Sequence, residues 1–215
     1  MSETLLFLNL FNNQTNNRGR IVILDNGHGG VINGIYQTPG KRSPNWDKGV
    51  LFEGMFNRWV VNRIIEKLDR KKIPYYHISP EFTDTTLETR TNRANHIFDQ
   101  NPDVWILSIH ANAGGSTGIE GFTTLGQKTS DGIGDLVLRN LKDDMIGTSM
   151  RFDWSDGDRD KEKDYYILKR PMAPAFLIEC GFMDHPIDYN NLWDEIYIDT
   201  LVDSLVRSII EVYNI

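Results

Sequence analysis

The sequence predicts an α/β fold, in which a three-layer arrangement holds a twisted, mostly parallel sheet with helices on both faces. Short apolar runs alternate with segments whose apolar residues recur at helical spacing, and this alternation is typical of a sheet covered by helices. Three of the runs lead directly into polar residues that can carry chemistry, as expected where buried strands of an open sheet end. A chain of 215 residues is long enough to bury such a core without disulfide bonds.

The expected strands are short apolar runs bounded by turn residues. They cover residues 21–25, 73–78, 103–109, 119–124, 165–168 and 174–178. The expected helices have apolar residues three and four positions apart. The first contains Phe56, Trp59, Val60, Ile64 and Leu68, the second Leu87, Ala94, Ile97 and Phe98, the third Ile133, Leu136, Val137, Leu141 and Met145, and the last, from about Ile198, contains Leu201, Val202, Leu205, Val206, Ile209 and Ile210.

Residues 1–18 are interpreted as an N-terminal tail and residues 19–215 as one domain. The apolar run from Leu5 to Phe11 is expected to pack on the domain as an added strand. It does not resemble a signal peptide, because Glu3 precedes it and an asparagine-rich stretch follows it. The irregular segments 31–50 and 148–164 are long for a compact domain, so we expect them to rim a substrate groove.

Composition excludes several classes of partner. The formal net charge of −7 argues against a protein that binds nucleic acid by neutralising phosphates. No segment approaches the roughly 20 apolar residues that a membrane helix needs, so we expect no membrane insertion. Cys180 is the only cysteine, which rules out an intramolecular disulfide. We expect a monomer.

Two histidines and a glutamate stand where three of the expected strands end. His28 follows the run that begins at Ile21 and is flanked by glycines, His110 ends the run from Val104, and Glu179 ends the run from Pro174. Because the carboxyl ends of parallel strands meet at one edge of a sheet, these side chains are expected to converge there.

This set of residues suggests a catalytic zinc site, which takes three protein ligands and leaves a fourth position for water. His28, His110 and Glu53, the last at the start of the first helix, are the candidate ligands. Zinc bound in this way lowers the pKa of its water to about 7. Glu179 is then the candidate to take the proton of that water and pass it to the leaving group.

Four motifs resemble those of the zinc-dependent N-acetylmuramoyl-L-alanine amidases of the amidase-3 family. They are Ile-Leu-Asp-Asn-Gly-His-Gly-Gly, Ser-Ile-His-Ala-Asn-Ala followed by Gly-Ile-Glu-Gly, Phe-Leu-Ile-Glu-Cys-Gly-Phe, and the segment from Leu87 to Asn95, which matches the family's Leu-x-x-Arg-x-x-x-Ala-Asn helix. The resemblance covers the chain from about Arg20 to its end.

The resemblance implies the substrate and the site roles. The substrate is the amide that joins the lactyl group of muramic acid to L-alanine in peptidoglycan. His28, Glu53 and His110 correspond to the ligands of one zinc ion per chain, and Glu179 corresponds to the catalytic carboxylate. The chain departs from the family at Asn26, where proline is usual, and at Asp184, where asparagine is usual, but neither position is a proposed ligand.

Two other functions stay open at this point. A thiol hydrolase would use Cys180, although a residue next to Glu179 on a strand should point to the opposite face. A non-catalytic wall-binding module would keep the fold without needing Glu179. Of the remaining histidines, His185 is a candidate substrate contact, whereas His77 and His96 are expected to lack a chemical role.

The biological setting implied by the sequence is that of a phage endolysin. No signal peptide, wall-binding repeat or autoinhibitory insertion is recognisable. We therefore expect the protein to wait in the host cytoplasm until lysis and then to act on the cell wall. Arg90 is expected to brace a loop or a carboxylate and not to touch the substrate.

Overall fold

A computed structural model describes residues 21–126 and 128–213 and contains a central six-stranded sheet in the order β4-β1-β5-β8-β6-β7. Strands β1 (Ile21–Asn26), β4 (Tyr75–His77), β5 (Val104–Asn112) and β8 (Ala175–Phe182) lie parallel to one another. Strand β6 (Glu120–Thr123) pairs antiparallel with β8, and β7 (Lys161–Glu162) pairs parallel with β6. The predicted tail and its expected added strand lie outside the described residues.

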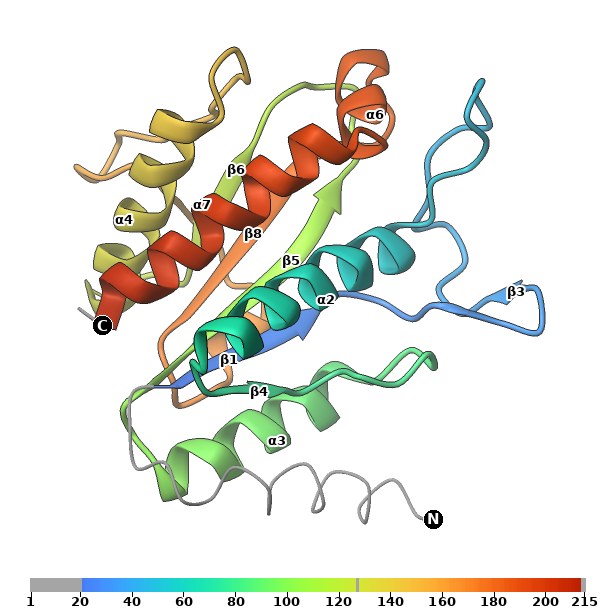
Figure 1. The fold of residues 1–215 in the computed structure, drawn as a ribbon. Helices are drawn as coiled ribbons and strands as arrows, with labels where there is room; N and C mark the ends of the chain where they lie inside the picture. Colours follow the sequence, from blue (N-terminus) through green and yellow to red (C-terminus); the bar gives the residue numbers. More distant parts are fainter. Residues whose placement is uncertain (1–20, 127, 214–215) are drawn as a thin grey trace.

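Helices cover both faces of the sheet, as predicted. Helices α2 (Glu53–Lys71), α4 (Lys128–Asp144) and α7 (Glu195–Tyr213) pack on one face, where α7 lies between the other two (Figure 1). Helix α3 (Leu87–Gln100) and the short α5 (Tyr166–Lys169) pack on the other face. The predicted three-layer α/β fold is therefore confirmed.

The side chains of β1 show how the sequence builds two cores. Val22 and Leu24 belong to the apolar cluster under α2 and α7, whereas Ile21 and Ile23 belong to the cluster under α3. All four are almost completely buried. Successive residues of a strand point to opposite faces, so a continuous apolar run is what a strand covered on both faces requires.

The prediction of a strand at residues 165–168 is wrong, because this segment forms α5. Its backbone hydrogen bonds close locally, with the amides of Leu168 and Lys169 both donating to the carbonyl of Tyr165. This single turn buries Ile167 and Leu168 together against the second core. A strand would have sent these neighbours to opposite faces. The strand that pairs with β6 on the side away from β8 is β7, which lies in a charged segment without an apolar run.

Two further elements lie in segments where no regular structure was expected. Residues 31–50 contain a small hairpin of β2 (Val31–Ile32) and β3 (Ile35–Tyr36), and helix α6 (Pro186–Leu192) follows β8. Within the part of the chain that the structure describes, no helix is both long enough and apolar enough to cross a membrane. The carboxyl ends of β1, β5 and β8 lie together at one edge of the sheet, next to the start of α2.

Candidate metal centre and active site

The turn that carries His28 depends on close packing at glycines. His28 has a left-handed backbone, with φ of 66°. A side chain at Gly27 would place its Cβ 2.0 Å from Cε1 of His110, and one at Gly54 would place it 2.0 Å from the carbonyl oxygen of Gly29. Glycine at these positions lets the turn, strand β5 and the first turn of α2 approach one another.

His28, Glu53 and His110 converge as the sequence predicts. Oε1 of Glu53 lies 3.2 Å from Nε2 of His28 and 3.0 Å from Nδ1 of His110. The two imidazole rings meet edge to face, with their centroids 5.1 Å apart. Each residue offers one ligand atom within 4.8 Å of the others. The three residues come from the end of β1, the start of α2 and the end of β5.

Glu53 is held as an anion inside the protein. Its exposed fraction is 2%, and burial by itself would raise the pKa of its carboxyl group. Hydrogen bonds from His110 and His28 outweigh burial and hold the pKa of Glu53 well below its ordinary value. Its backbone amide donates to the carbonyl of Lys41, which fixes the start of α2. A buried carboxylate between two imidazoles is a suitable electrostatic environment for a cation.

Glu179 lies beside this group and has an unsatisfied oxygen. In the sheet it is the register partner of His110, and its Oε2 is buried without a hydrogen-bond partner among the residues that the structure describes. Glu179 and Glu53 line a cavity of about 390 Å³ together with Lys41 and Asn112. Burial and the charge of Glu53 raise the pKa of Glu179 well above its ordinary value, while Lys41 opposes this rise.

The donor set fits zinc. Two imidazole nitrogens and one carboxylate oxygen are a known ligand set of catalytic zinc, which keeps a fourth position open. The orphaned oxygen of Glu179 borders the same cavity as Glu53. The chain thus offers three candidate ligands, a cavity beside them and a carboxylate outside the candidate ligand set.

Cys180 lies on the opposite face from Glu179. It is completely buried in the apolar cluster under α7, together with Ile178. Burial raises the pKa of the Cys180 thiol well above its ordinary value, which disfavours the thiolate that a nucleophile requires.

The other three histidines stand outside the group of His28, Glu53 and His110. Nε2 of His77 contacts Oδ1 of Asn26 at 2.5 Å, and burial lowers the pKa of His77 to about 4. A ring nitrogen of His96 contacts Gln100. His185 precedes α6, and its Nδ1 is buried with no hydrogen-bond partner within residues 21–126 and 128–213. A substrate contact for His185 stays a prediction.

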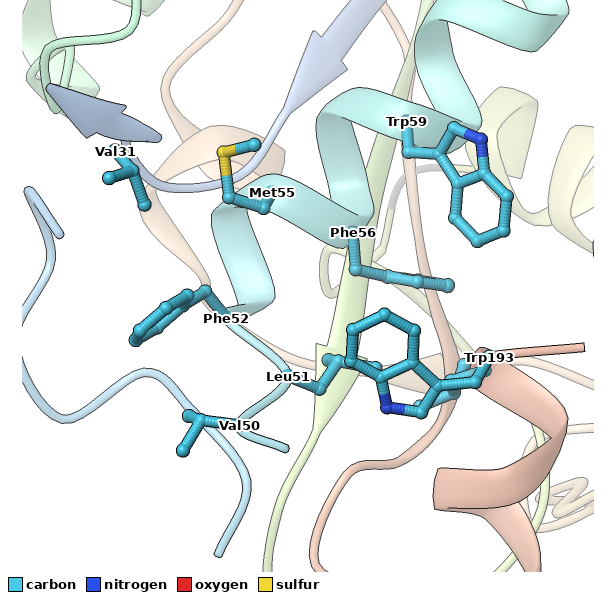
Figure 2. Close-up of a pocket in the computed structure, with 9 residues that line it drawn as sticks. Val31, Val50, Leu51, Phe52, Met55, Phe56, Trp59 and Trp193 are labelled. Atoms are coloured by element: carbon cyan, nitrogen blue, oxygen red, sulfur yellow. The ribbon is translucent and has the colours of Figure 1, made fainter. Parts of the chain in front are cut away.

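A second cavity, of about 350 Å³, lies against the first turns of α2 and is almost entirely apolar (Figure 2). Its lining includes Phe52, Met55, Trp59 and Trp193 but no titratable group. Because Phe52 precedes Glu53 and Met55 follows it by two residues, this cavity adjoins the candidate metal centre, but its lining residues supply no acid–base group.

Sequence reasoning missed the polar groups that surround the centre. Arg90 forms ion pairs with carboxylates, as expected, but the sequence did not indicate that one of them is the buried Asp25. Asp25 directly follows the apolar residues of β1 and is completely buried. Its place in a strand buried on both faces is a usable signal, because a buried carboxylate needs partners. Lys41, in the irregular segment 31–50, gave no such signal.

The chain belongs to the amidase-3 family of N-acetylmuramoyl-L-alanine amidases, whose pattern it matches over residues 22–211. It is 27% identical over 197 residues to the uncharacterised protein YqiI of Bacillus subtilis (strain 168). That alignment covers 91% of this chain and 86% of YqiI. It is 28% identical over 132 residues to the sporulation-specific N-acetylmuramoyl-L-alanine amidase of the same organism, covering 60% of this chain and 47% of that protein.

Solved structures share the fold. The N-acetylmuramoyl-L-alanine amidase of Clostridium difficile 630 aligns with a TM-score of 0.73 at 23% identity, covering 91% of this chain and 97% of that one. Family membership makes the protein an enzyme, an N-acetylmuramoyl-L-alanine amidase that acts on peptidoglycan, and the solved structure shows that it has the fold of such an enzyme.

Proposed function

We propose that His28, Glu53 and His110 hold one zinc ion and that Glu179 is the catalytic carboxylate for hydrolysis of the amide between the lactyl group of N-acetylmuramic acid and L-alanine. The observation that carries this proposal is the convergence of the three ligand atoms within 4.8 Å. The unsatisfied oxygen of Glu179 at the same cavity supports the second role.

When bound, zinc acts as a Lewis acid and lowers the pKa of a water molecule towards neutrality. Glu179 accepts a proton from the attacking water on its Oε2 and returns it to the alanine nitrogen as the C–N bond breaks. The products are a lactyl carboxylate and a free alanine amine. The raised pKa of Glu179 suits the second half of this cycle, because a carboxyl group that holds its proton can serve as an acid.

Purified peptidoglycan tests the reaction and the metal together. The zinc-loaded protein should release new N-terminal alanine without new reducing sugar ends. A chelator should abolish this release, and added zinc should restore it. New reducing ends would identify a glycosidase, and activity that survives complete removal of metal would contradict the zinc site.

The same assay separates the two rival functions. A thiol hydrolase would resist the chelator and fail when Cys180 is replaced by alanine, whereas we expect Cys180→Ala to keep its activity because the thiol lies on the other face of the sheet. A wall-binding module would bind peptidoglycan without releasing alanine.

We also propose that the enzyme serves phage lysis, acting from the host cytoplasm once the membrane is breached, and that it acts as a monomer. The support is a fold shared with the catalytic domain of the CD27L endolysin, at a TM-score of 0.63 and 17% identity. The sporulation-specific relative favours a bacterial role in sporulation instead. Expression in a bacterial host distinguishes these settings. A lysis enzyme should stay inside intact cells and lyse them when the membrane is permeabilised, and export from intact cells would contradict this setting.

A further inference from the structure

His28 holds a backbone conformation that a histidine rarely adopts. Its φ of 66° lies in the left-handed region, where the Cβ of an L-residue is crowded. Such a conformation persists only when the surrounding structure holds it in place. The contacts that hold this turn therefore bear on where the His28 imidazole sits.

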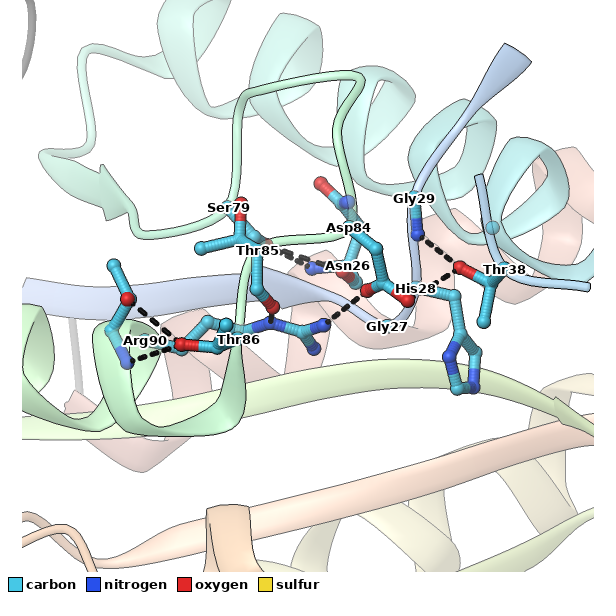
Figure 3. Close-up of polar contacts among 12 residues, drawn as sticks. Asn26, Gly27, His28, Gly29, Thr38, Ser79, Asp84, Thr85, Thr86 and Arg90 are labelled. Atoms are coloured by element: carbon cyan, nitrogen blue, oxygen red, sulfur yellow. Dashed lines mark hydrogen bonds and ion pairs between the residues drawn. The ribbon is translucent and has the colours of Figure 1, made fainter. Parts of the chain in front are cut away.

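Thr38 and Asp84 supply one such contact from two different loops. The amide of Gly29 donates to Oγ1 of Thr38 at 2.9 Å, and the Thr38 hydroxyl donates to Oδ2 of Asp84 at 2.7 Å (Figure 3). The direction of both bonds is determined, because an amide can only donate and a carboxylate can only accept. The Thr38 hydroxyl thus accepts one hydrogen bond, from Gly29, and donates one, to Asp84.

Arg90 joins this pair to the buried interior. Its Nη2 lies 3.3 Å from Oδ1 of Asp84, and its Nη1 lies 3.5 Å from Oδ2 of Asp25. Oδ2 of Asp25 accepts a hydrogen bond of 2.7 Å from Ser108, which stands two residues before His110 on β5. One polar chain therefore runs from the amide after His28 to the strand that carries His110.

Thr38 and Asp84 contribute little to the core itself. Thr38 is half-buried and Asp84 is exposed, and neither belongs to the apolar clusters. Thr38 accepts a hydrogen bond from the turn next to a candidate ligand, and Asp84 accepts one from Thr38. This placement resembles that of outer groups that orient metal ligands, whose loss typically lowers metal affinity by about 10- to 100-fold.

We propose that Thr38 and Asp84 are positioning residues that hold the His28 turn ready for metal and so set the affinity of the site for zinc. This inference rests on the proposed zinc site. Thr38→Val keeps the shape of the side chain but removes both hydrogen bonds, whereas Thr38→Ser keeps the hydroxyl. Thr85→Val is a matched control, because Thr85 makes a similar hydrogen bond to Glu81 without contacting the His28 turn.

The test is the zinc dissociation constant of the metal-free protein, measured by competition with a chromophoric chelator. We expect an increase of about 10- to 100-fold for Thr38→Val and for Asp84→Ala. Thr38→Ser and Thr85→Val should stay within about threefold of wild type. Amide exchange of Gly29, followed by NMR in the metal-free protein, should accelerate in Thr38→Val and not in Thr85→Val.

The outcomes separate this inference from the proposed function. If wild type binds zinc and folded Thr38→Val and Asp84→Ala bind it equally tightly, the positioning role is wrong and the zinc site stands. If wild type itself does not bind zinc, both proposals are wrong. Should Thr38→Val fail to fold, Asp84→Ala decides, because it keeps the Gly29–Thr38 hydrogen bond and removes only the exposed carboxylate that the Thr38 hydroxyl and Arg90 contact.

Discussion

At the scale of single residues, the centre depends on positions where no side chain fits. Gly27 is the clearest case, because the imidazole of His110 occupies the space where its side chain would lie. Gly54 has the same role against the backbone of the His28 turn. The candidate ligands and these two glycines therefore pack as one unit. The histidines can approach Glu53 because the backbone is close at Gly27 and Gly54.

Gly27→Ala is expected to disrupt this unit. The new Cβ would overlap the His110 ring, which must shift away from Glu53, so we expect a loss of about 1–3 kcal/mol in the free energy of unfolding and weaker zinc binding. Gly132→Ala is the matched control. Gly132 lies inside α4, and a Cβ at this position would meet no other atom within 4 Å, so alanine there should stabilise by about 0.5–1 kcal/mol.

Thermal unfolding and zinc titration of both variants check this prediction. A Gly27→Ala protein with the stability and zinc affinity of wild type would show that the His110 ring does not need that space.

The sequence predicted the four candidate site residues but not the residues that support them. His28, His110 and Glu179 were recognisable because each ends an apolar run, and Glu53 because it begins a helix of clear period. Thr38 and Asp84 lie in irregular loops, and their contact joins positions 46 residues apart. No local pattern encodes such a contact, so only the folded chain reveals it.

At the scale of elements, the sequence predicts strands well where burial on both faces produces a continuous apolar run. Strands β1, β5 and β8 are of this kind, and all three were predicted. The run at 165–168 has the same composition but folds as α5, because four residues between charged segments can bury Ile167 and Leu168 together in a single turn. Composition alone does not distinguish these outcomes.

The edge formed by β6 and β7 carries a buried acid that should make stability depend on pH. Asp160, just before β7, accepts a hydrogen bond from Thr123 and lies close to the carboxyl group of Asp158. Burial and the nearby charge of Asp158 raise the pKa of Asp160 to about 7 from an ordinary value of 3.8. Between these pH values the folded state holds a proton that the unfolded state has lost, so the free energy of unfolding should fall as pH rises from about 4 to about 7.

Asp160→Asn should remove this dependence, because an amide keeps the size of the side chain without its charge. We expect the variant to exceed wild type in stability by about 1 kcal/mol at pH 8 and to lose the advantage near pH 4. Denaturant unfolding at several pH values measures the effect. Parallel stability curves for the two proteins would show that Asp160 does not titrate in this range.

At the scale of the whole molecule, the fold brings together segments that lie far apart in the chain. The centre takes its residues from the ends of β1, β5 and β8 and the start of α2, and parallel pairing places these ends at one edge of the sheet. Glu53 contacts both histidines. A cation bound by all three side chains would therefore add further bonds between β1, α2 and β5.

Zinc should therefore stabilise the entire domain. At a free zinc concentration about 1,000-fold above the dissociation constant, a ligand that binds only the folded state adds about 4 kcal/mol. For a chain of this size, that corresponds to a rise of about 10 °C in Tm. Thermal unfolding of metal-free protein with and without added zinc measures the effect. An unchanged Tm at saturating zinc would indicate that no folded-state zinc site exists.

Glu53 is proposed to hold the metal and Glu179 to move the proton, and a comparison of two variants separates these roles. Glu53→Gln and Glu179→Gln are compared with wild type for bound zinc and for alanine release from peptidoglycan, with exposed Glu66→Gln as the control. Glu179→Gln should bind zinc like wild type and lose activity by about 100-fold or more. Glu53→Gln should lose zinc as well as activity. Full activity in zinc-loaded Glu179→Gln would contradict the account.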